Sequence, residues 1–458
     1  MAFDRFISRA ASQSRVIDLE EGERSRAILR FQIPLGITAL IMASTFTIVN
    51  AGLARTISPQ AALAAFALAQ SVTNLFASPL WSTRNMMVAL GTDRVSMHNA
   101  IVATLGSAFL VTVWIASLGY TPLGEFIYAR IFGAPAHLLP DIMDVVRLCI
   151  LLPAIYGLRG WGQAVILLHR RTPLLVFAML IRLALMIPMA FYLPRTGFFS
   201  PTGVGGAIWV FGMCFEAISC ALFARRLNRT YPDVIPAPVS PSASTSLRES
   251  VKFLLPLIAH ALLSSSTFPA INAALARSTS PELSLASFQV AWSLAFLFVA
   301  FVHPNMGQTV MVFLESGRWW RSLRRVGYWI IGLDSLAMAL TALTGAAAWI
   351  LVGLMGIDPS LMGVVRVILL LTVSSVILGG LVDMWVGVAM KSRRTGIVGI
   401  AKGADVLIVI LVAFGAVSIR PDIGGIIAPI ALGLGLAANL LILYKMVPIE
   451  VPETRKPR

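Results

Sequence analysis

Charged residues are scarce in this chain. Only 12% of its 458 residues are Asp, Glu, Lys or Arg, whereas soluble domains carry about 25%. With so little charge, the chain cannot cover a water-soluble globule with polar surface, and 57% of its residues are hydrophobic. The composition therefore excludes an ordinary soluble protein and indicates a surface that faces lipid.

Cysteines and catalytic motifs are also rare or missing. The three cysteines lie inside apolar runs without metal-ligand spacing, so we expect small buried side chains rather than disulfides: Cys149, Cys214 and Cys220. The sequence has no HExxH, GxSxG or Walker A motif. We expect no enzyme activity, no metal, no cofactor and no ATPase domain. The charged first 30 residues also argue against a cleavable signal peptide.

Long apolar runs dominate what is present. A helix needs about 20 mostly apolar residues to cross the bilayer core. The runs predict twelve membrane-spanning helices, at 31–54, 62–83, 98–120, 141–168, 174–193, 203–224, 251–275, 284–312, 326–352, 360–390, 396–417 and 423–446.

The basic residues predict the orientation of these spans. Of 36 Lys and Arg residues, 27 lie in the two tails and at the even-numbered connections, five lie at the odd-numbered connections, and four lie deeper within spans. Because cytoplasmic segments are enriched in Lys and Arg, both termini are predicted to be cytoplasmic. The net charge of +15 is thus an orientation signal, and no nucleic-acid partner is expected.

The chain contains an internal repeat. Residues 31–66 align with residues 253–288 at a constant shift of 222, with 18 of 36 positions identical and no gap. The identical pairs include Asn50 with Asn272 and Arg55 with Arg277. Since six spans separate the copies, both halves enter the membrane from the same side and run parallel.

The predicted fold is an all-α membrane protein of two parallel six-helix bundles, related by a pseudo-twofold axis along the membrane normal. The predicted parts are a cytoplasmic tail at 1–30, a bundle at 31–226, a Pro- and Ser-rich cytoplasmic linker at 227–249, a bundle at 250–446 and a cytoplasmic tail at 447–458. Two facing bundles favour an alternating-access transporter. The rival interpretation is a membrane scaffold or intramembrane enzyme.

Polar and charged side chains inside spans are costly, so they mark candidate sites. We predict a substrate-binding role for seven of them: Asn50, Arg147, Arg159, Gln163, Arg182, Asn272 and Arg366. The alternatives are interhelical hydrogen bonds for the asparagines, and a pair with Asp144 for Arg147. Gly157, Gly160 and Gly162 would thin the helix around Arg159, which allows close packing or a cavity.

A second group is predicted to serve in ion coupling or gating: Glu216, Asp334, Asp383, Lys402 and Asp405. By the repeat, Arg182 and Asp405 occupy equivalent positions near the midplane, where they could meet across the cleft as an ion pair or gate. Lys402 could instead pair with Asp405. His303 and His260 are weaker candidates. Pro34 and Pro256 are predicted to open the first span of each half. The alternative is that Gly36 and Ser264–Thr267 let these two helices bend during gating.

The opening of each half, at Pro34–Phe66 and Pro256–Phe288, resembles the multidrug and toxin extrusion (MATE) family and its flippase relatives. The basic signature of the major facilitator superfamily is missing from Gly91–Ala100. Within the MATE-like superfamily the chain resembles the progressive ankylosis family of pyrophosphate and organic-anion exporters. The segments that carry this resemblance are Leu29–Thr38, Ser78–Leu90 and Trp161–Arg171.

The resemblance implies a MATE-like exporter or exchanger in the inner or plasma membrane. The implied substrate is a small organic or phosphorylated anion such as pyrophosphate, citrate or a nucleotide, and the several intramembrane Arg residues favour an anion. The sequence departs from the MATE pattern at Asn50. One branch of MATE pumps uses an Asp in the first span to couple transport to a cation, and an Asn does not titrate. The alternatives are a flippase of a lipid-linked or amphiphilic substrate, and a multidrug cation antiporter. The sequence does not indicate an oligomeric state.

Overall fold

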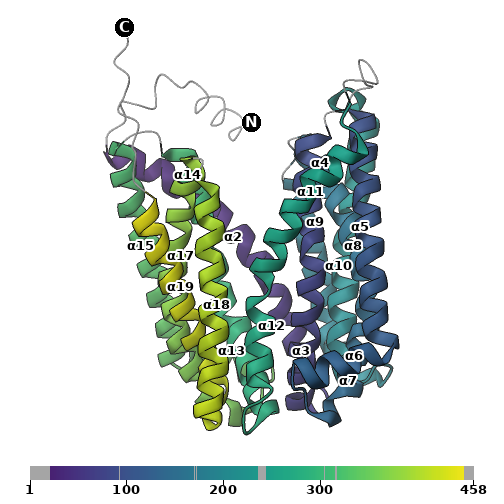
Figure 1. Cartoon of the computed structure of the whole chain (residues 1–458), viewed down its shortest axis with the longest axis vertical. Helices are drawn as coiled ribbons and strands as arrows, with labels where there is room; N and C mark the ends of the chain where they lie inside the picture. The colour runs from purple at the N-terminus through teal and green to yellow at the C-terminus, as the bar shows by residue number, and fades with distance from the viewer. Residues whose placement is uncertain are drawn as a thin grey trace.

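The computed structural model describes residues 21–91, 93–169, 171, 173–235, 244–303, 305–314, 317–392 and 394–447. Within these residues the chain is helical and two lobes stand side by side (Figure 1). The lobes converge at one end and splay apart at the other, where the first described helix begins and the last one ends (Figure 1). We call these ends the closed face and the terminal face.

The first half follows the predicted spans closely. Its elements are α2 (Glu21–Leu53), α3 (Pro59–Ala77), η1 (Ser78–Ser82), α4 (Thr83–Leu90), α5 (Arg94–Tyr120), α6 (Pro122–Phe126), η2 (Ile127–Ile131), η3 (Ala136–Leu138), α7 (Leu139–Cys149), α8 (Leu152–Leu168), α9 (Pro173–Thr196), α10 (Pro201–Thr230) and η4 (Pro232–Val234).

The second half repeats this order. Its elements are α11 (Leu247–Ser265), α12 (Thr267–Leu275), α13 (Pro281–Val302), α14 (Asn305–Phe313), α15 (Gly317–Leu343), α16 (Ala346–Ala348), η6 (Trp349–Leu354), η7 (Pro359–Leu361), α17 (Met362–Lys391), α18 (Thr395–Ile419), η8 (Pro421–Ile426) and α19 (Ile427–Met446).

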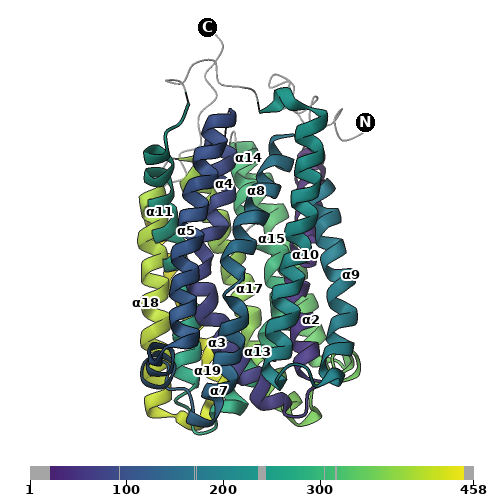
Figure 2. The same cartoon turned by 90° about the vertical axis from the view of Figure 1, so that its right-hand side faces the viewer.

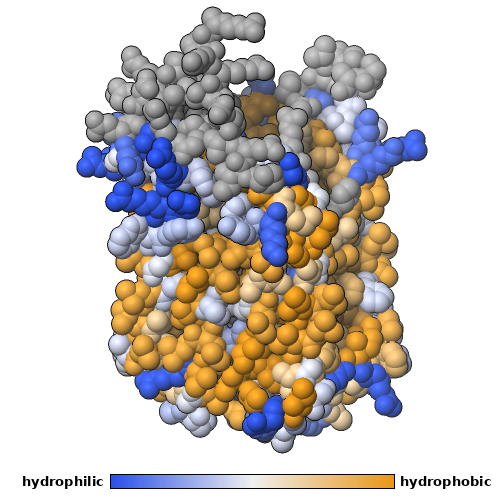
Figure 3. Space-filling model, turned by 60° about the vertical axis from the view of Figure 1, so that its left-hand side comes forward, coloured by the Kyte–Doolittle hydropathy of each residue, from blue (hydrophilic) through white to orange (hydrophobic). Residues whose placement is uncertain are grey.

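Eleven helical segments among the described residues are long and apolar enough to cross a membrane. The remaining predicted span, 141–168, is present as α7 and α8, which are separated at Ile150 and Leu151 just before Pro153. A proline removes one backbone donor and clashes with the preceding turn, which accounts for the interruption. An apolar band runs across the middle of the surface, with charged residues above and below it (Figure 3). The chain is an integral membrane protein.

Some boundaries differ from the prediction. The predicted span 326–352 is divided, because α15 ends at Leu343 and is followed by the short α16 and the π-helix η6. The helix α2 begins at Glu21, inside the predicted tail, so Pro34 lies within the helix instead of opening it. The equivalent span of the second half is interrupted at Ser266, between α11 and α12, so only this copy is broken. Residues 236–243 of the predicted linker lie outside the described residues.

The first spans of the two halves are exchanged between the lobes. The helix α2 packs on α13, α14 and α15 of the second half and on α9 and α10 of the first. Gln32, in its terminal-face part, accepts from Thr309 in α14, whereas Gly52, near its other end, lies against Ile208 in α10 and Ala190 in α9. Conversely, α11 packs on η1, α4 and α5 of the first half, and α12 packs on α18. Figure 1 shows α2 and α11 crossing the space between the lobes, and Figure 2 shows the spans standing upright side by side. We call α3–α10 the first lobe and α13–α19 the second lobe.

Candidate functional site

A buried carboxylate with three donors lies in the first lobe. The Glu216 side chain in α10 is fully buried. Its Oε1 accepts hydrogen bonds from Arg159 Nε at 2.6 Å and from Gln163 Nε2 at 2.9 Å, both on α8. Its Oε2 accepts a hydrogen bond from Arg182 Nη1 on α9. Three predicted site residues are thus brought together by Glu216, one of the four carboxylates predicted to act in coupling or gating.

A further arginine joins this cluster through Gln163. Arg84 Nη1 in α4 donates to Gln163 Oε1 at 3.3 Å. Sequence reasoning missed Arg84 as a site residue, because it was counted among the charges that orient the chain. A signal was present: Arg84 is the only charged residue between Arg55 and Asp93, and it lies almost two turns before the end of α4. We call Arg84, Arg159, Gln163, Arg182 and Glu216 the arginine cluster.

The arginine cluster carries a surplus of positive charge. Its three guanidinium groups remain protonated in proteins, and one carboxylate opposes them. In addition, Arg84 Nε, Arg182 Nε and Arg182 Nη2 are buried and have no hydrogen-bond partner in the described part of the chain. Buried unsatisfied donors are costly, more so when charged. An anion that accepted these hydrogen bonds would lower that cost.

Glycines on α8 bring the cluster together. A Cβ on Gly162 would lie 2.7 Å from the backbone carbon of Cys220 in α10, and one on Gly160 would lie 3.0 Å from Thr83 Oγ1 in α4. The absent side chains therefore let α10 and α4 approach α8 closely enough for Glu216 and Arg84 to reach Gln163. The predicted thinning of this helix by glycine is confirmed at these two positions.

The second lobe contains a separate set of ionisable groups. His303 Nδ1 and Asp383 Oδ2 lie 3.0 Å apart, and a Cβ on Gly379 would overlap the imidazole, so the glycine makes room for this ring. Asp334 Oδ2 is buried and lacks a hydrogen-bond partner among the described residues. His303, the weaker candidate from sequence, is therefore the partner of Asp383. The side chain of His260 lies outside the described residues.

Arg182 and Asp405 do not form a pair across the lobes. Asp405 Oδ2 accepts from Lys402 Nζ at 2.8 Å and from Asn439 Nδ2 at 3.4 Å, all in the second lobe. Arg182 is held by Glu216 in the first lobe. Equivalent positions in the repeat face equivalent directions within their own bundles, and each charge has a nearer partner there. The predicted pairing of Lys402 with Asp405 is present.

Arg147 and Arg366 lie away from the arginine cluster. Arg147 Nε donates to the carbonyl of Gly119 at 2.9 Å, and its Nη1 lies 3.4 Å from Asp144 Oδ1. Arg366 is exposed, and its Nη2 donates to the carbonyl of Thr344 at 3.5 Å. Each arginine joins its own helix to the end of the preceding span, near the closed face.

Asn50 and Asn272 join the two halves of the chain. Asn50 in α2 is fully buried, and its Nδ2 donates to the carbonyl of Gln289 in α13 at 3.3 Å. Asn272 in α12 donates from Nδ2 to the carbonyl of Ala67 in α3 at 3.0 Å. These are the interhelical hydrogen bonds that the sequence offered as the alternative to substrate contact.

Two arginines add a second set of contacts between the halves at the closed face. Arg55 donates to the carbonyls of Leu354, at 2.6 Å, and Met355, at the end of η6. Arg277 donates to the carbonyls of Ile131, at 2.5 Å, and Phe132, at 3.0 Å, at the end of η2. In both cases the positive side chain caps the carbonyl end of a short helix in the other half.

The two-lobed fold is that of MATE transporters. An inward-facing MATE family transporter of the MOP superfamily matches with a TM-score of 0.62 and 14% identity, covering 91% of this chain and all of that one. A MOP superfamily transporter from Pyrococcus furiosus, whose binding pocket is described as reversed in polarity, matches with a TM-score of 0.57 and 17% identity. The match covers 92% of this chain and 95% of that one. A mutant of the Vibrio cholerae MATE transporter VcmN matches with a TM-score of 0.58 and 15% identity, covering 93% of this chain and 97% of that one.

Within this fold class, the family model described as progressive ankylosis protein (ANKH) matches residues 18–190. The resemblance predicted from the sequence, to MATE-like proteins and to the progressive ankylosis family, is thereby confirmed. No curated protein matches the sequence significantly. MATE proteins have twelve helices in two bundles, which confirms the predicted fold class.

Proposed function

We propose that this protein is a secondary transporter that moves a small organic or phosphorylated anion between two bundles by alternating access. The observation that carries the proposal is the arginine cluster, which has three guanidinium groups, one carboxylate and three buried donors without partners in the described part of the chain. Guanidinium groups bind phosphate and carboxylate oxygens through paired hydrogen bonds. A cation or a neutral drug would leave the surplus charge unopposed.

In this mechanism Glu216 is an internal counter-ion that the substrate displaces. Its carboxylate is bound by Arg159 and Arg182, as a substrate carboxylate or phosphate would be. An incoming anion would take over these donors and also reach the unsatisfied nitrogens of Arg182. Once displaced, Glu216 would be stabilised by taking up a proton, since an unpaired carboxylate is costly away from water. Substrate binding and proton uptake would therefore be coupled.

The second lobe would contribute further coupling groups. Five ionisable residues lie in candidate membrane-spanning segments of the second lobe, separate from the arginine cluster: His303, Asp334, Asp383, Lys402 and Asp405. The His303–Asp383 pair and the unpartnered Asp334 Oδ2 are suited to hold a proton while the lobes move. Asn50 and Asn272 would act in gating rather than in substrate binding, because both bind backbone carbonyls of the other half.

The lobes converge away from the termini, and the termini are expected in the cytoplasm. The splayed end would therefore face the cytoplasm. In agreement, the inward-facing MATE structure matches with a TM-score of 0.62, and an outward-facing MATE structure matches at 0.55. We propose that the structure represents the inward-facing state of an exporter or exchanger in the inner or plasma membrane.

Counterflow in proteoliposomes tests the substrate class and its site. Labelled pyrophosphate, citrate and ATP are offered to the wild type, Arg159→Gln, Arg182→Gln and, as a control, Arg366→Gln. We expect saturable flux of at least one anion, reduced at least tenfold in the first two variants and retained in the control. Folded protein that moves none of the three anions, or an Arg366→Gln defect as large as that of Arg159→Gln, would contradict the proposal.

A Glu216→Gln variant tests the counter-ion role. Because this change removes the only carboxylate of the cluster, we expect a transported anion to raise the thermal unfolding midpoint of Glu216→Gln more than that of the wild type. Flux through the variant should also lose its dependence on a proton gradient. Equal stabilisation by the anion and unchanged proton dependence would show that Glu216 is structural, even if transport itself is confirmed.

A further inference from the structure

A second basic site lies at the terminal face of the first lobe. A pocket of about 340 Å³ opens between α5, α8, α10 and the η4 segment. It is a different site from the arginine cluster, because none of the five cluster residues lines it. The helix α5, which contributes its first two turns, begins at Arg94, where a membrane-spanning segment starts.

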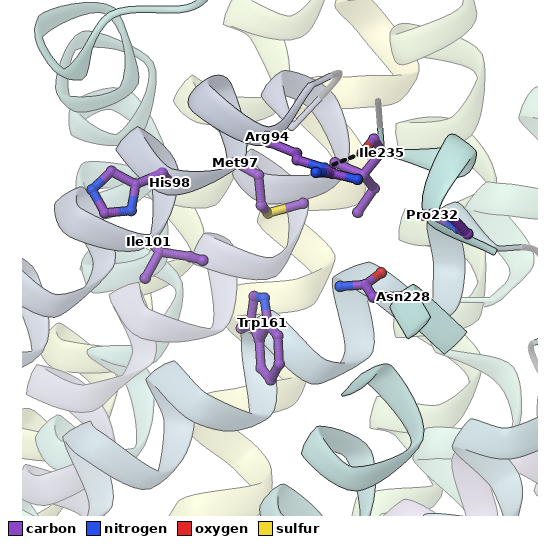
Figure 4. A pocket seen from close by; sticks show the side chains of 8 residues that line it. All are labelled: Arg94, Met97, His98, Ile101, Trp161, Asn228, Pro232 and Ile235. Atoms are coloured by element: carbon purple, nitrogen blue, oxygen red, sulfur yellow. Dashed lines mark hydrogen bonds between the residues drawn. The ribbon is translucent and has the colours of Figure 1, made fainter. Parts of the chain in front are cut away.

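The polar groups that line this pocket can all donate hydrogen bonds. They are the guanidinium of Arg94, the imidazole of His98, the indole N–H of Trp161 and the amide of Asn228, and none of the lining residues is acidic. Figure 4 shows the polar ends of Trp161 and Asn228 turned toward the space below Arg94. A lining of donors without a carboxylate is suited to an anion.

Arg94 is held in place by the segment that follows η4. Its Nε donates to the carbonyl of Ile235 at 3.3 Å, which uses one of the five guanidinium N–H groups. Among the described residues no hydrogen bond uses the terminal N–H groups of Arg94, and their forked geometry suits phosphate oxygens. The guanidinium is therefore oriented before a ligand arrives, which lowers the entropic cost of binding.

The remaining walls are apolar. Met97 and Ile101 lie on the same face of α5 as Arg94 and His98, and Ile235 lies beside Arg94 (Figure 4). A ligand that fits both surfaces has a charged group beside Arg94 and an apolar part beyond it. A membrane phospholipid has this arrangement at this depth, where its phosphate lies at the end of the hydrocarbon region and where Trp side chains also concentrate.

We propose that this pocket binds the phosphate group of an anionic phospholipid, through Arg94, His98, Trp161 and Asn228. The volume is suited to a headgroup rather than a whole lipid. The proposal is independent of the transported substrate, because the pocket and the arginine cluster share no residue. A soluble phosphate ester offers the same chemistry from the cytoplasm, so the test includes both sources.

The test measures the thermal unfolding midpoint of the purified full chain in detergent. The additions are dioleoyl phosphatidylglycerol, dioleoyl phosphatidylcholine and soluble glycerol phosphate. The variants are Arg94→Gln, His98→Gln and, as a control of equal charge, Arg321→Gln, an exposed arginine of the second lobe. His98→Gln guards against misfolding, since His98 forms no hydrogen bond or ion pair with the described residues, whereas Arg94 holds Ile235.

We expect phosphatidylglycerol to raise the midpoint of the wild type and of Arg321→Gln, and the rise to be at least halved in Arg94→Gln and His98→Gln. Phosphatidylcholine should have little effect. If glycerol phosphate raises the midpoint as much as phosphatidylglycerol does, the pocket binds phosphate as proposed, but its ligand is a soluble phosphate ester and not a lipid. A rise that is the same in all variants, or no preference for phosphatidylglycerol over phosphatidylcholine, would overturn the proposal.

Discussion

Asn50 and Asn272 form the same hydrogen bond in opposite directions between the two halves of the chain. The asparagines are separated by 222 residues, and so are their acceptors, the carbonyls of Gln289 and Ala67. The pseudo-twofold axis of the repeat therefore relates a pair of bonds that both cross between halves. Arg55 and Arg277 reproduce this relationship at the closed face. Opening the closed face requires all four contacts to break.

The asparagine bonds give a first prediction. Asn50→Ala or Asn272→Ala removes about 1 kcal/mol of net hydrogen bonding from the closed arrangement, which shifts a two-state population by about fivefold. Spin labels at Ile57→Cys and Thr279→Cys, exposed and repeat-equivalent, would report the separation across the closed face in a background without the native cysteines. Both variants should gain a population with a longer distance. Distributions identical to the parent would show that the bonds do not hold the face closed.

The arginine caps give a second prediction with larger effects. Hydrogen bonds to charged groups contribute about 1.5–3 kcal/mol, so Arg55→Gln and Arg277→Gln should open the closed face more than the asparagine variants do. The two substitutions should act alike, because each arginine caps two carbonyls of a short helix in the other half. The same pair of spin labels measures this. A large effect of one substitution without the other would contradict the twofold relationship.

The close packing of α8 on α10 gives a third prediction. Gly162→Ala would place a Cβ 2.7 Å from the backbone of Cys220, so the helices must separate and the bond from Gln163 to Glu216 lengthens. We expect a loss of about 1–3 kcal/mol in stability, seen as a lower thermal unfolding midpoint. Gly106→Ala in α5 is the matched control, since nothing lies within 4 Å of its added Cβ. It should be neutral or stabilising, because alanine favours helix.

Asp93, which lies between two spans, gives a prediction for pH. Burial raises the pKa of this carboxyl, but hydrogen bonds from Ser96, Ser244 and Val95 outweigh it and hold the pKa below its usual range. A carboxyl with a lowered pKa stabilises the fold above its unfolded pKa of about 3.9, and this contribution is lost as the pH falls through the folded value.

The substitution Asp93→Asn should therefore lower the unfolding midpoint at pH 7, and the difference from the wild type should shrink as the pH falls below about 4. Unfolding followed between pH 7 and pH 3 measures this. A difference that stays constant over that range would mean that the charge of Asp93 does not contribute, and that the loss comes from the altered cap of α5 alone.

The sequence by itself determined the approximate positions of the spans, their number, and which residues of the two halves are equivalent in the repeat. Hydropathy is a local property of each segment, so its runs locate α2, α5 and α10 without knowledge of their neighbours. The repeat likewise identified Asn50 with Asn272 and Arg55 with Arg277 before their contacts were known. Sequence also placed Arg159 and Gln163 on one helix, one turn apart.

Only the tertiary structure decided which charges meet. Glu216 reaches Arg159 and Arg182 because α8, α9 and α10 pack with particular rotations about their axes, and an apolar run does not encode that rotation. For the same reason Arg84 belongs to the cluster although it was assigned to orientation, and Asp405 pairs with Lys402 rather than with Arg182. The exchange of α2 and α11 between lobes was also hidden, because it depends on contacts between segments far apart in the chain.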